Sequence, residues 1–118
     1  MGGMMSNNRM YRRIALAVLA TMTVAGCAGM AGRVPPVDEA MVVAAAPDDV
    51  DRETLERGRT VYLRDCGRCH TPVSVNRYDE PGWREILPRM YEKAYLSSQE
   101  ASDLRGYILT VSRMQADR

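Results

Sequence analysis

The sequence predicts an all-α fold, a small domain of three to four helices over residues 48–118. Apolar residues recur at helical spacing in three separate segments, and no segment alternates apolar and polar residues as a half-buried strand would. The size of the domain indicates how it is stabilised. A domain of only about 70 residues has a small apolar core and commonly depends on disulfides or a metal centre. The 118-residue chain contains no phenylalanine, and its aromatic residues are one tryptophan and six tyrosines.

The first expected helix runs from about Asp49 to Arg64. Acidic side chains near its beginning favour a helix start there, because they interact well with the positive end of the helix dipole. These side chains are Asp48, Asp49, Asp51 and Glu53. The residues expected to share its apolar face are Leu55, Gly58, Val61 and Tyr62.

The last expected helix begins at a capping box, Ser97 followed three positions later by Glu100. Its apolar stripe consists of Leu104, Tyr107, Ile108 and Val111. Another stripe lies between the two helices and consists of Trp83, Ile86, Leu87, Met90, Ala94 and Tyr95. Pro88 interrupts this stripe, so we expect the middle helix to kink there or to split at Leu87.

The amino terminus resembles an export signal. Arg9, Arg12 and Arg13 form a positive region, and the apolar stretch 14–25 that follows is too short for a permanent membrane-spanning helix. Its end, Val24-Ala25-Gly26-Cys27, resembles the lipobox of bacterial lipoproteins, in which the cysteine becomes the lipidated first residue. We therefore expect a lipoprotein signal peptide over residues 1–26; the alternative is an ordinary cleavage site followed by a chance cysteine.

Residues 27–47 are expected to form a flexible tether from lipidated Cys27. The segment is rich in small residues, contains Pro35-Pro36 and has no sustained helical or strand period. The alternative is that part of it packs on the domain through Val42-Val43.

The charge balance argues against nucleic acid as a partner. The whole chain has 16 basic and 15 acidic side chains, and removal of the three arginines before Cys27 leaves 13 against 15. A nearly neutral chain lacks the strongly basic face that nucleic-acid binding needs.

The motif Cys66-Gly67-Arg68-Cys69-His70 is C-x-x-C-H, the attachment sequence of a c-type haem. Its two thiols can bond to the two haem vinyl groups, and the histidine can ligate the iron. A structural zinc site needs four ligands, and beyond the motif the chain offers only Cys27. A thioredoxin-like thiol pair requires a βαβ context that is not evident, and an accidental C-x-x-C-H remains as the last alternative.

Over its last 70 residues or so, the chain resembles the class I cytochrome c family. In that family a glycine-containing helix precedes C-x-x-C-H and crosses the C-terminal helix at an aromatic residue. Gly58, Val61 and Tyr62 before Cys66 are similar to the first element, and Tyr107-Ile108-Leu109 is similar to the second. The resemblance implies a cytochrome c-like domain wrapped around one covalently attached haem c.

The resemblance also directs the search for a second iron ligand. His70 is the only histidine, so methionine, lysine, water or an open site must complete the iron. Of the methionines after the signal peptide, Met30 and Met41 lie in the expected tether and Met114 lies at the far end of the last helix. Met90 remains as the expected ligand, although the family usually places its methionine in a loop; plain core packing of Met90 is the alternative.

With histidine and methionine both bound, the iron has no place for a substrate. We therefore expect an electron carrier rather than an enzyme, anchored by lipid on the periplasmic face of a membrane and exchanging single electrons with redox protein partners. The alternatives are a haem-based sensor or binder of small ligands with an open sixth site, the cytochrome subunit of a dehydrogenase, and, least favoured, a thiol oxidoreductase. Trp83 is a candidate to pack on the porphyrin and to donate its indole N–H to a haem propionate; simple core packing of Trp83 is the alternative. Candidate propionate or partner contacts, each more simply a solvated surface side chain, are Arg68, Arg77, Arg84 and Arg89.

Overall fold

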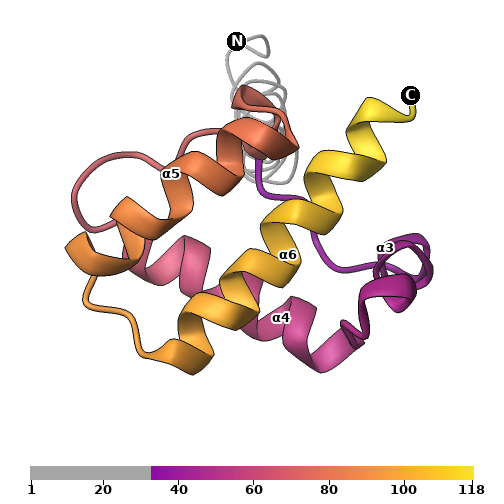
Figure 1. Cartoon of the computed structure of the whole chain (residues 1–118), viewed down its shortest axis with the longest axis horizontal. Helices are drawn as coiled ribbons and strands as arrows, with labels where there is room; N and C mark the ends of the chain where they lie inside the picture. The colour runs from indigo at the N-terminus through magenta and orange to yellow at the C-terminus, as the bar shows by residue number, and fades with distance from the viewer. Residues whose placement is uncertain (1–32) are drawn as a thin grey trace, which may run out of the picture. The chain divides into compact units, whose positions relative to one another are not determined.

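The computed structural model describes residues 33–118, and within that range it contains helices and no strand. The prediction of an all-α fold is confirmed for this part of the chain. Figure 1 shows the long last helix, α6, running across α4, with α5 beside it. The elements in order are α3 (Glu39–Ala45), the 3₁₀ turn η1 (Ala46–Asp48), α4 (Arg52–Val61), the π-helical turn η2 (Tyr62–Cys66), the 3₁₀ turn η3 (Val75–Arg77), α5 (Glu80–Lys93) and α6 (Ser98–Ala116).

Helix α4 begins three residues later than the sequence predicts. Asp49 adopts a left-handed conformation with φ 55°, which ends the preceding turn and cannot continue into a helix. Asp51 then caps α4, its carboxylate accepting a hydrogen bond from the Thr54 backbone N–H at 2.8 Å. At its other end α4 runs on into η2, so helical structure reaches the first cysteine of the motif.

Helix α6 follows the prediction closely. The Ser97 side chain accepts from the Glu100 N–H, and the Glu100 carboxylate accepts in return from the Ser97 N–H at 2.9 Å, which completes the capping box. The expected apolar stripe is buried, with Leu104, Tyr107 and Ile108 completely inaccessible to solvent.

The contact between α4 and α6 depends on Gly58. A Cβ atom at this position would lie 2.1 Å from the Asp103 carbonyl oxygen and 2.8 Å from the Tyr107 Cβ. Only glycine allows the two backbones to approach so closely. The predicted crossing of these helices at a glycine and an aromatic residue is confirmed.

Helix α5 runs unbroken from Glu80 to Lys93, so the predicted alternative of a split at Leu87 is wrong, while the other predicted effect of Pro88, a kink, stays a prediction. Pro88 lies inside the helix and is exposed, where water can replace the hydrogen bond that proline cannot donate. The burial of Trp83 and Leu87 holds the helix against the core. After Lys93 the chain turns through Tyr95, whose φ of 55° is left-handed.

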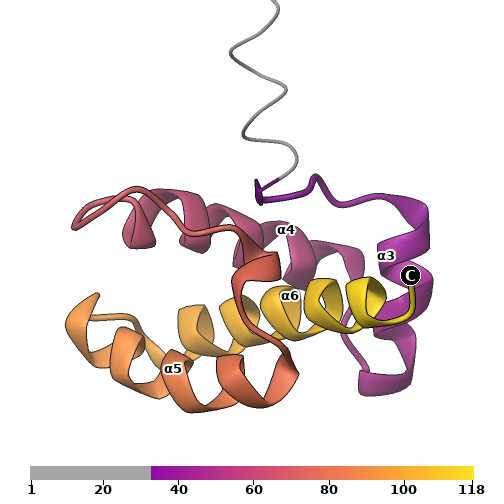
Figure 2. The same cartoon turned by 90° about the horizontal axis from the view of Figure 1, so that it is seen from above.

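The structure corrects the expectation of a flexible tether for residues 33–47; residues 27–32 lie outside the described part. Helix α3 occupies part of this segment, and Val34, Met41 and Ala45 are buried. Figure 2 shows the segment lying against one end of α4 and α6. We call residues 33–48 the N-terminal strap.

Hydrogen bonds hold the N-terminal strap to helices α4 and α6. The Tyr107 hydroxyl donates to the Pro35 carbonyl oxygen at 2.7 Å, and Arg59 Nε donates to the same oxygen at 3.0 Å. Two ion pairs, Arg52 with Glu39 and Arg113 with Asp48, fix the strap further along. The folded unit therefore begins at least 15 residues before residue 48.

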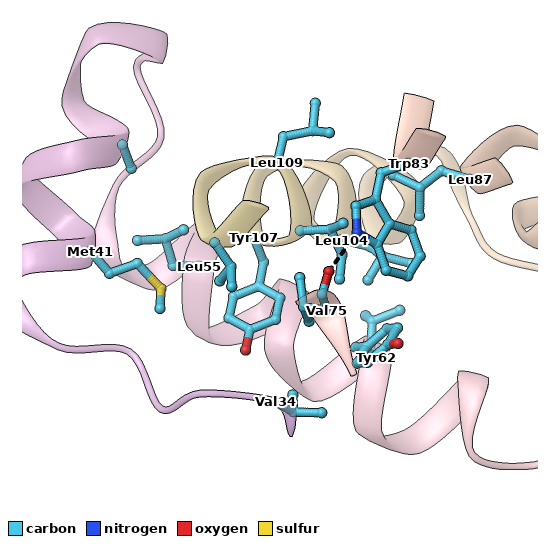
Figure 3. Packing of buried hydrophobic residues seen from close by; sticks show 14 residues of the cluster. Val34, Met41, Leu55, Tyr62, Val75, Trp83, Leu87, Leu104, Tyr107 and Leu109 are labelled. Carbon is cyan, nitrogen blue, oxygen red and sulfur yellow. Dashed lines mark hydrogen bonds between the residues drawn. The ribbon is translucent and has the colours of Figure 1, made fainter. Parts of the chain in front are cut away.

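The core continues from the strap to α5, as Figure 3 shows. At its far end the Trp83 indole N–H donates to the Val75 carbonyl oxygen at 2.8 Å. Trp83 also meets two tyrosine rings edge to face, Tyr62 at 6.3 Å and Tyr78 at 5.2 Å between ring centroids. These rings form the boundary between the core and the cavity that contains the motif.

Candidate functional site

The C-x-x-C-H motif and Met90 lie in the wall of one cavity, which has a volume of about 310 Å³. The sequence selected these residues from different segments, and the fold brings them together: the motif follows α4, and Met90 comes from α5. The complete lining consists of Tyr62, Asp65, Cys66, Cys69, His70, Val73, Tyr78, Trp83, Ile86, Leu87, Met90, Lys93 and Ala94.

The π-helical turn η2 positions the start of the motif. Its residues 62–66 continue α4 with a wider turn, a local distortion that recurs at functional sites. The Tyr62 hydroxyl at its beginning donates to the Val73 carbonyl oxygen at 2.6 Å. This bond joins the two ends of the segment that contains the motif. It therefore holds the loop through Cys66, Cys69 and His70 at the wall of the cavity.

Asp65 provides a buried negative charge beside Cys66. Its carboxylate is 5 % exposed and pairs with the Arg64 guanidinium at 2.6 Å and the Arg68 guanidinium at 3.3 Å. Arg64 extends the network to Glu100 at 2.6 Å, which links the motif to the start of α6. Buried charges need such partners, so this network fixes the backbone just before the first cysteine.

The two cysteines of the motif are free thiols with different surroundings. Cys66 is half-buried and Cys69 is exposed, and neither forms a disulfide. Burial raises the pKa of the Cys66 thiol to about 11, with smaller contributions from Asp65 and Cys69. Thiol oxidoreductases need the opposite, a lowered thiol pKa, so the surroundings of Cys66 do not favour that alternative.

His70 is exposed and its ring is oriented by one hydrogen bond. Nδ1 lies 3.0 Å from the Thr71 carbonyl oxygen. A carbonyl oxygen can only accept, so this contact favours the tautomer of the neutral imidazole in which Nδ1 carries the proton and Nε2 has the lone pair. An imidazole held in this tautomer is suited to bind a metal through Nε2.

Among the methionines of residues 33–118, only Met90 lines the cavity. It is half-buried and lies on the same face of α5 as Trp83, Ile86 and Leu87, which also line the cavity. Met41 is instead buried in the core from α3, and Met114 packs against the core near the end of α6. Met30 lies outside the described residues.

Two expectations about haem propionates do not fit the structure. The Trp83 N–H is already bonded to the Val75 carbonyl and is buried, so it is not free to donate to another group. None of the four arginines considered from the sequence lines the cavity. Three of them pair with neighbouring carboxylates instead: Arg68 with Asp65, Arg84 with Glu80 and Arg89 with Glu85.

The sequence analysis missed Lys93, the single lysine of the chain and the one basic residue in the cavity wall. Its position in the sequence could have revealed it, because residues three positions apart, such as Met90 and Lys93, lie on one face of a helix. Lys93 offers the cavity a positive charge that none of the arginines provides.

No group of three or more His, Cys, Asp or Glu side chains within residues 33–118 is arranged to hold a metal ion. In the same range no helix is long and apolar enough to cross a membrane. The signal peptide over 1–26 and Cys27 lie outside the described residues, so both remain predictions.

Comparison with known proteins identified no relative. No protein-family model matches the chain, and neither a curated protein nor a solved structure matches it. The chemistry of the site is therefore inferred from its own residues.

Proposed function

We propose that this chain is a c-type cytochrome with one covalently attached haem, which passes single electrons between redox proteins. The observation that carries the proposal is that Cys66, Cys69, His70 and Met90 line a single cavity. Two thiols at this spacing, an imidazole directly after them and a thioether from another helix are the donor set of a histidine–methionine haem c.

The cavity suits a flat and largely apolar group. Besides the motif and Met90, much of its wall is made of aromatic and aliphatic side chains, including Tyr62, Ile86 and Leu87. Its volume of about 310 Å³ is in the lower part of the range of sites for small molecules and cofactors, roughly 300–1,000 Å³. Cys69 and His70 are exposed without a bound group, so attachment of a haem would cover them.

Each residue has a defined part in holding the haem. The Cys66 and Cys69 thiols would each add across one vinyl group, forming one carbon–sulfur bond and transferring the thiol hydrogen to the other vinyl carbon, with no net oxidation. His70 Nε2 and the Met90 sulfur would hold the iron of the haem. When bound, the haem supplies an iron that gains and loses one electron, and the two protein ligands exclude a substrate from it.

We also propose that the protein is exported and held by lipid at Cys27 on the periplasmic face of a bacterial membrane. The N-terminal strap shortens the free tether, because residues 34–47 are packed on the domain. Seven residues, 27–33, precede the packed part, and a fully extended chain of that length spans at most roughly 25 Å. This short reach favours membrane-associated redox partners over distant ones.

The visible absorption spectrum of the full chain matured with haem tests the haem proposal. We expect a weak sulfur-to-iron band in the oxidised wild type and no reaction of the reduced protein with carbon monoxide. Met90→Ala should lose the band and bind carbon monoxide. Met114→Ala, a matched loss of a methionine that lies outside the cavity, should behave as wild type.

Two results would contradict parts of this proposal. Ready binding of carbon monoxide by the wild type would reject Met90 as a ligand and favour the alternative, a binder or sensor of small ligands. Purified protein with two titratable thiols and no covalent haem would reject the haem site altogether. A stable complex recovered with a larger catalytic protein would instead identify the chain as a dehydrogenase subunit.

A further inference from the structure

Asp65 places a negative charge in the wall of the motif cavity, where water screens it little. Its side chain is 4 % exposed, whereas Lys93, the lysine of the same wall, is exposed. An ionised carboxylate is costly to remove from water, so one in the wall of a candidate site requires an explanation. Its ion pairs hold the backbone before Cys66, and its place in the wall gives its charge a second possible use.

The positive partners of Asp65 are screened by water much more than Asp65 itself. The Arg64 and Arg68 side chains are 51 % and 67 % exposed, and neither residue lines the cavity. Arg64 also pairs with Glu100 at 2.6 Å, which offsets part of its charge. Water and salt screen exposed charges strongly and buried charges much less. The field that this network produces in the cavity is therefore negative.

The thiol of Cys66 responds to the charge of Asp65. Cys66 follows Asp65 directly in the chain, and both line the cavity. Burial is the main cause of the raised pKa of the Cys66 thiol, and the negative charge of Asp65 is the next largest. A nearby negative charge has this effect because it disfavours the thiolate. The charge of Asp65 thus acts on a sulfur atom to which the proposed haem would be attached.

From this arrangement we infer that Asp65 sets the reduction potential of the haem by stabilising the oxidised state of the iron. The inference rests on the proposed haem site. Oxidation passes one electron from the iron to a redox partner and leaves one more positive charge on the iron. A poorly screened negative charge nearby favours that state. Histidine–methionine ligation raises the reduction potential, and Asp65 lowers it.

Redox titration of the full chain matured with haem, followed by its visible spectrum, tests the inference. Asp65→Asn keeps the side-chain shape and removes the charge, so the reduction potential should rise. At a fixed applied potential the ratio of reduced to oxidised haem should increase about tenfold, which corresponds to about 59 mV for one electron. Arg68→Gln removes a positive charge beside Asp65 and should change the ratio in the opposite direction, by less because Arg68 is exposed.

Arg52→Gln is the matched control. Arg52 is also a partly exposed arginine paired with a carboxylate, and its replacement changes the net charge of the chain as Arg68→Gln does. Helical structure from residue 52 to residue 65 spans roughly 20 Å at about 1.5 Å per residue, which exceeds the screening length of roughly 10 Å. The reduction potential should therefore stay at the wild-type value.

Opposite shifts in Asp65→Asn and Arg68→Gln distinguish an effect of charge from damage to the structure, because damage does not reverse with the sign of the charge that is removed. The sulfur-to-iron band, recorded for each variant, checks that Met90 still binds the iron. Unchanged potentials, or shifts in the same direction, would overturn the inference and leave the proposed haem site standing. Wild-type protein without covalent haem would overturn both.

A measurement on the full chain without haem provides the test if Asp65→Asn does not acquire the group. The rate of alkylation of Cys66 against pH, followed by peptide mass spectrometry, gives the pKa of this thiol. Asp65→Asn should lower that pKa relative to wild type, and Arg52→Gln should leave it unchanged. An unchanged pKa in Asp65→Asn would show that the charge of Asp65 does not reach the site, which would overturn the inference.

Discussion

Gly58 of α4 lies directly against Tyr107 of α6, so that a methyl group at Gly58 would come within 2.8 Å of the Tyr107 Cβ. The same methyl group would lie 2.1 Å from the Asp103 carbonyl oxygen, which belongs to the backbone and cannot turn aside. The two helices therefore have to separate if any side chain is added at residue 58.

The first prediction follows from this contact. Gly58→Ala should lower the free energy of unfolding by about 1–3 kcal/mol, the usual cost of overpacking, despite the higher helix propensity of alanine. Urea denaturation followed by circular dichroism measures the effect. Gly106→Ala is the control, because a Cβ there meets only side-chain atoms at 3.2 Å or more, and its effect should stay below about 1 kcal/mol of destabilisation. Equal destabilisation by the two changes would argue against the close crossing.

The second prediction concerns the N-terminal strap. Tyr107→Phe removes the hydrogen bond to the Pro35 carbonyl and should cost about 1 kcal/mol, since Arg59 still donates to that oxygen. Hydrogen exchange of the α3 backbone should become faster, because the strap is held less firmly. Tyr95→Phe, at a side chain that is 94 % exposed, should change neither quantity. Unchanged exchange in Tyr107→Phe would show that the other strap contacts suffice.

The third prediction concerns the indole of Trp83. Trp83→Phe would leave the Val75 carbonyl without its donor and reduce the packing next to Tyr62, so we expect a loss of about 1–3 kcal/mol in unfolding free energy. Chemical denaturation of the full chain measures it. Tyr78→Phe keeps the neighbouring aromatic ring and should have little effect. If Trp83→Phe left the free energy of unfolding unchanged, the buried hydrogen bond would contribute nothing to stability.

The fourth prediction is a pH dependence of stability through Glu100. Hydrogen bonds from the Ser97 backbone N–H and side chain, together with that from Arg64, lower the pKa of Glu100 to about 2 from 4.5. A lowered carboxyl pKa contributes stability that is fully present above about pH 4.5 and is lost as the pH falls towards 2.

Denaturation of wild type and Glu100→Gln between pH 7 and about 2 tests this directly. The stability difference between the two proteins should shrink over the acid part of that range. Glu92→Gln changes an exposed glutamate that has no ion pair within the described residues and provides the control. A difference that stays constant down to about pH 2 would show that the Glu100 network is not formed in solution.

The local features of the fold were accessible from the sequence because they depend on neighbouring residues. The capping box of Ser97 and Glu100 and the apolar spacing of α6 are such features, and both are present. The spacing of the α5 stripe likewise placed Met90 on the face that lines the cavity. Local preference left open whether Pro88 would kink α5 or split it, because it could not weigh the burial of Trp83 and Leu87 that keeps α5 unbroken.

Contacts between distant residues could not be deduced in the same way. The strap segment has small residues and prolines and no clear period, yet the Pro35 carbonyl meets the Tyr107 hydroxyl 72 positions later. The sequence left Trp83 between a propionate contact and plain core packing, and the fold supplies the Val75 carbonyl as the partner of its N–H. Lys93 could be recognised as part of the cavity wall only once the structure showed the cavity.

The sequence by itself determined the helical class of the domain, the start of α6 and the set of residues from which a haem site is proposed. Periodicity, caps and the C-x-x-C-H spacing are properties of a few adjacent residues, so they can be recognised before the chain folds. Only the tertiary structure decided that residues 33–48 belong to the domain, that Cys66 is half-buried and that the Trp83 N–H pairs with the Val75 carbonyl. Burial and the pairing of polar groups depend on which segments meet, and that is settled by the packing of the whole chain.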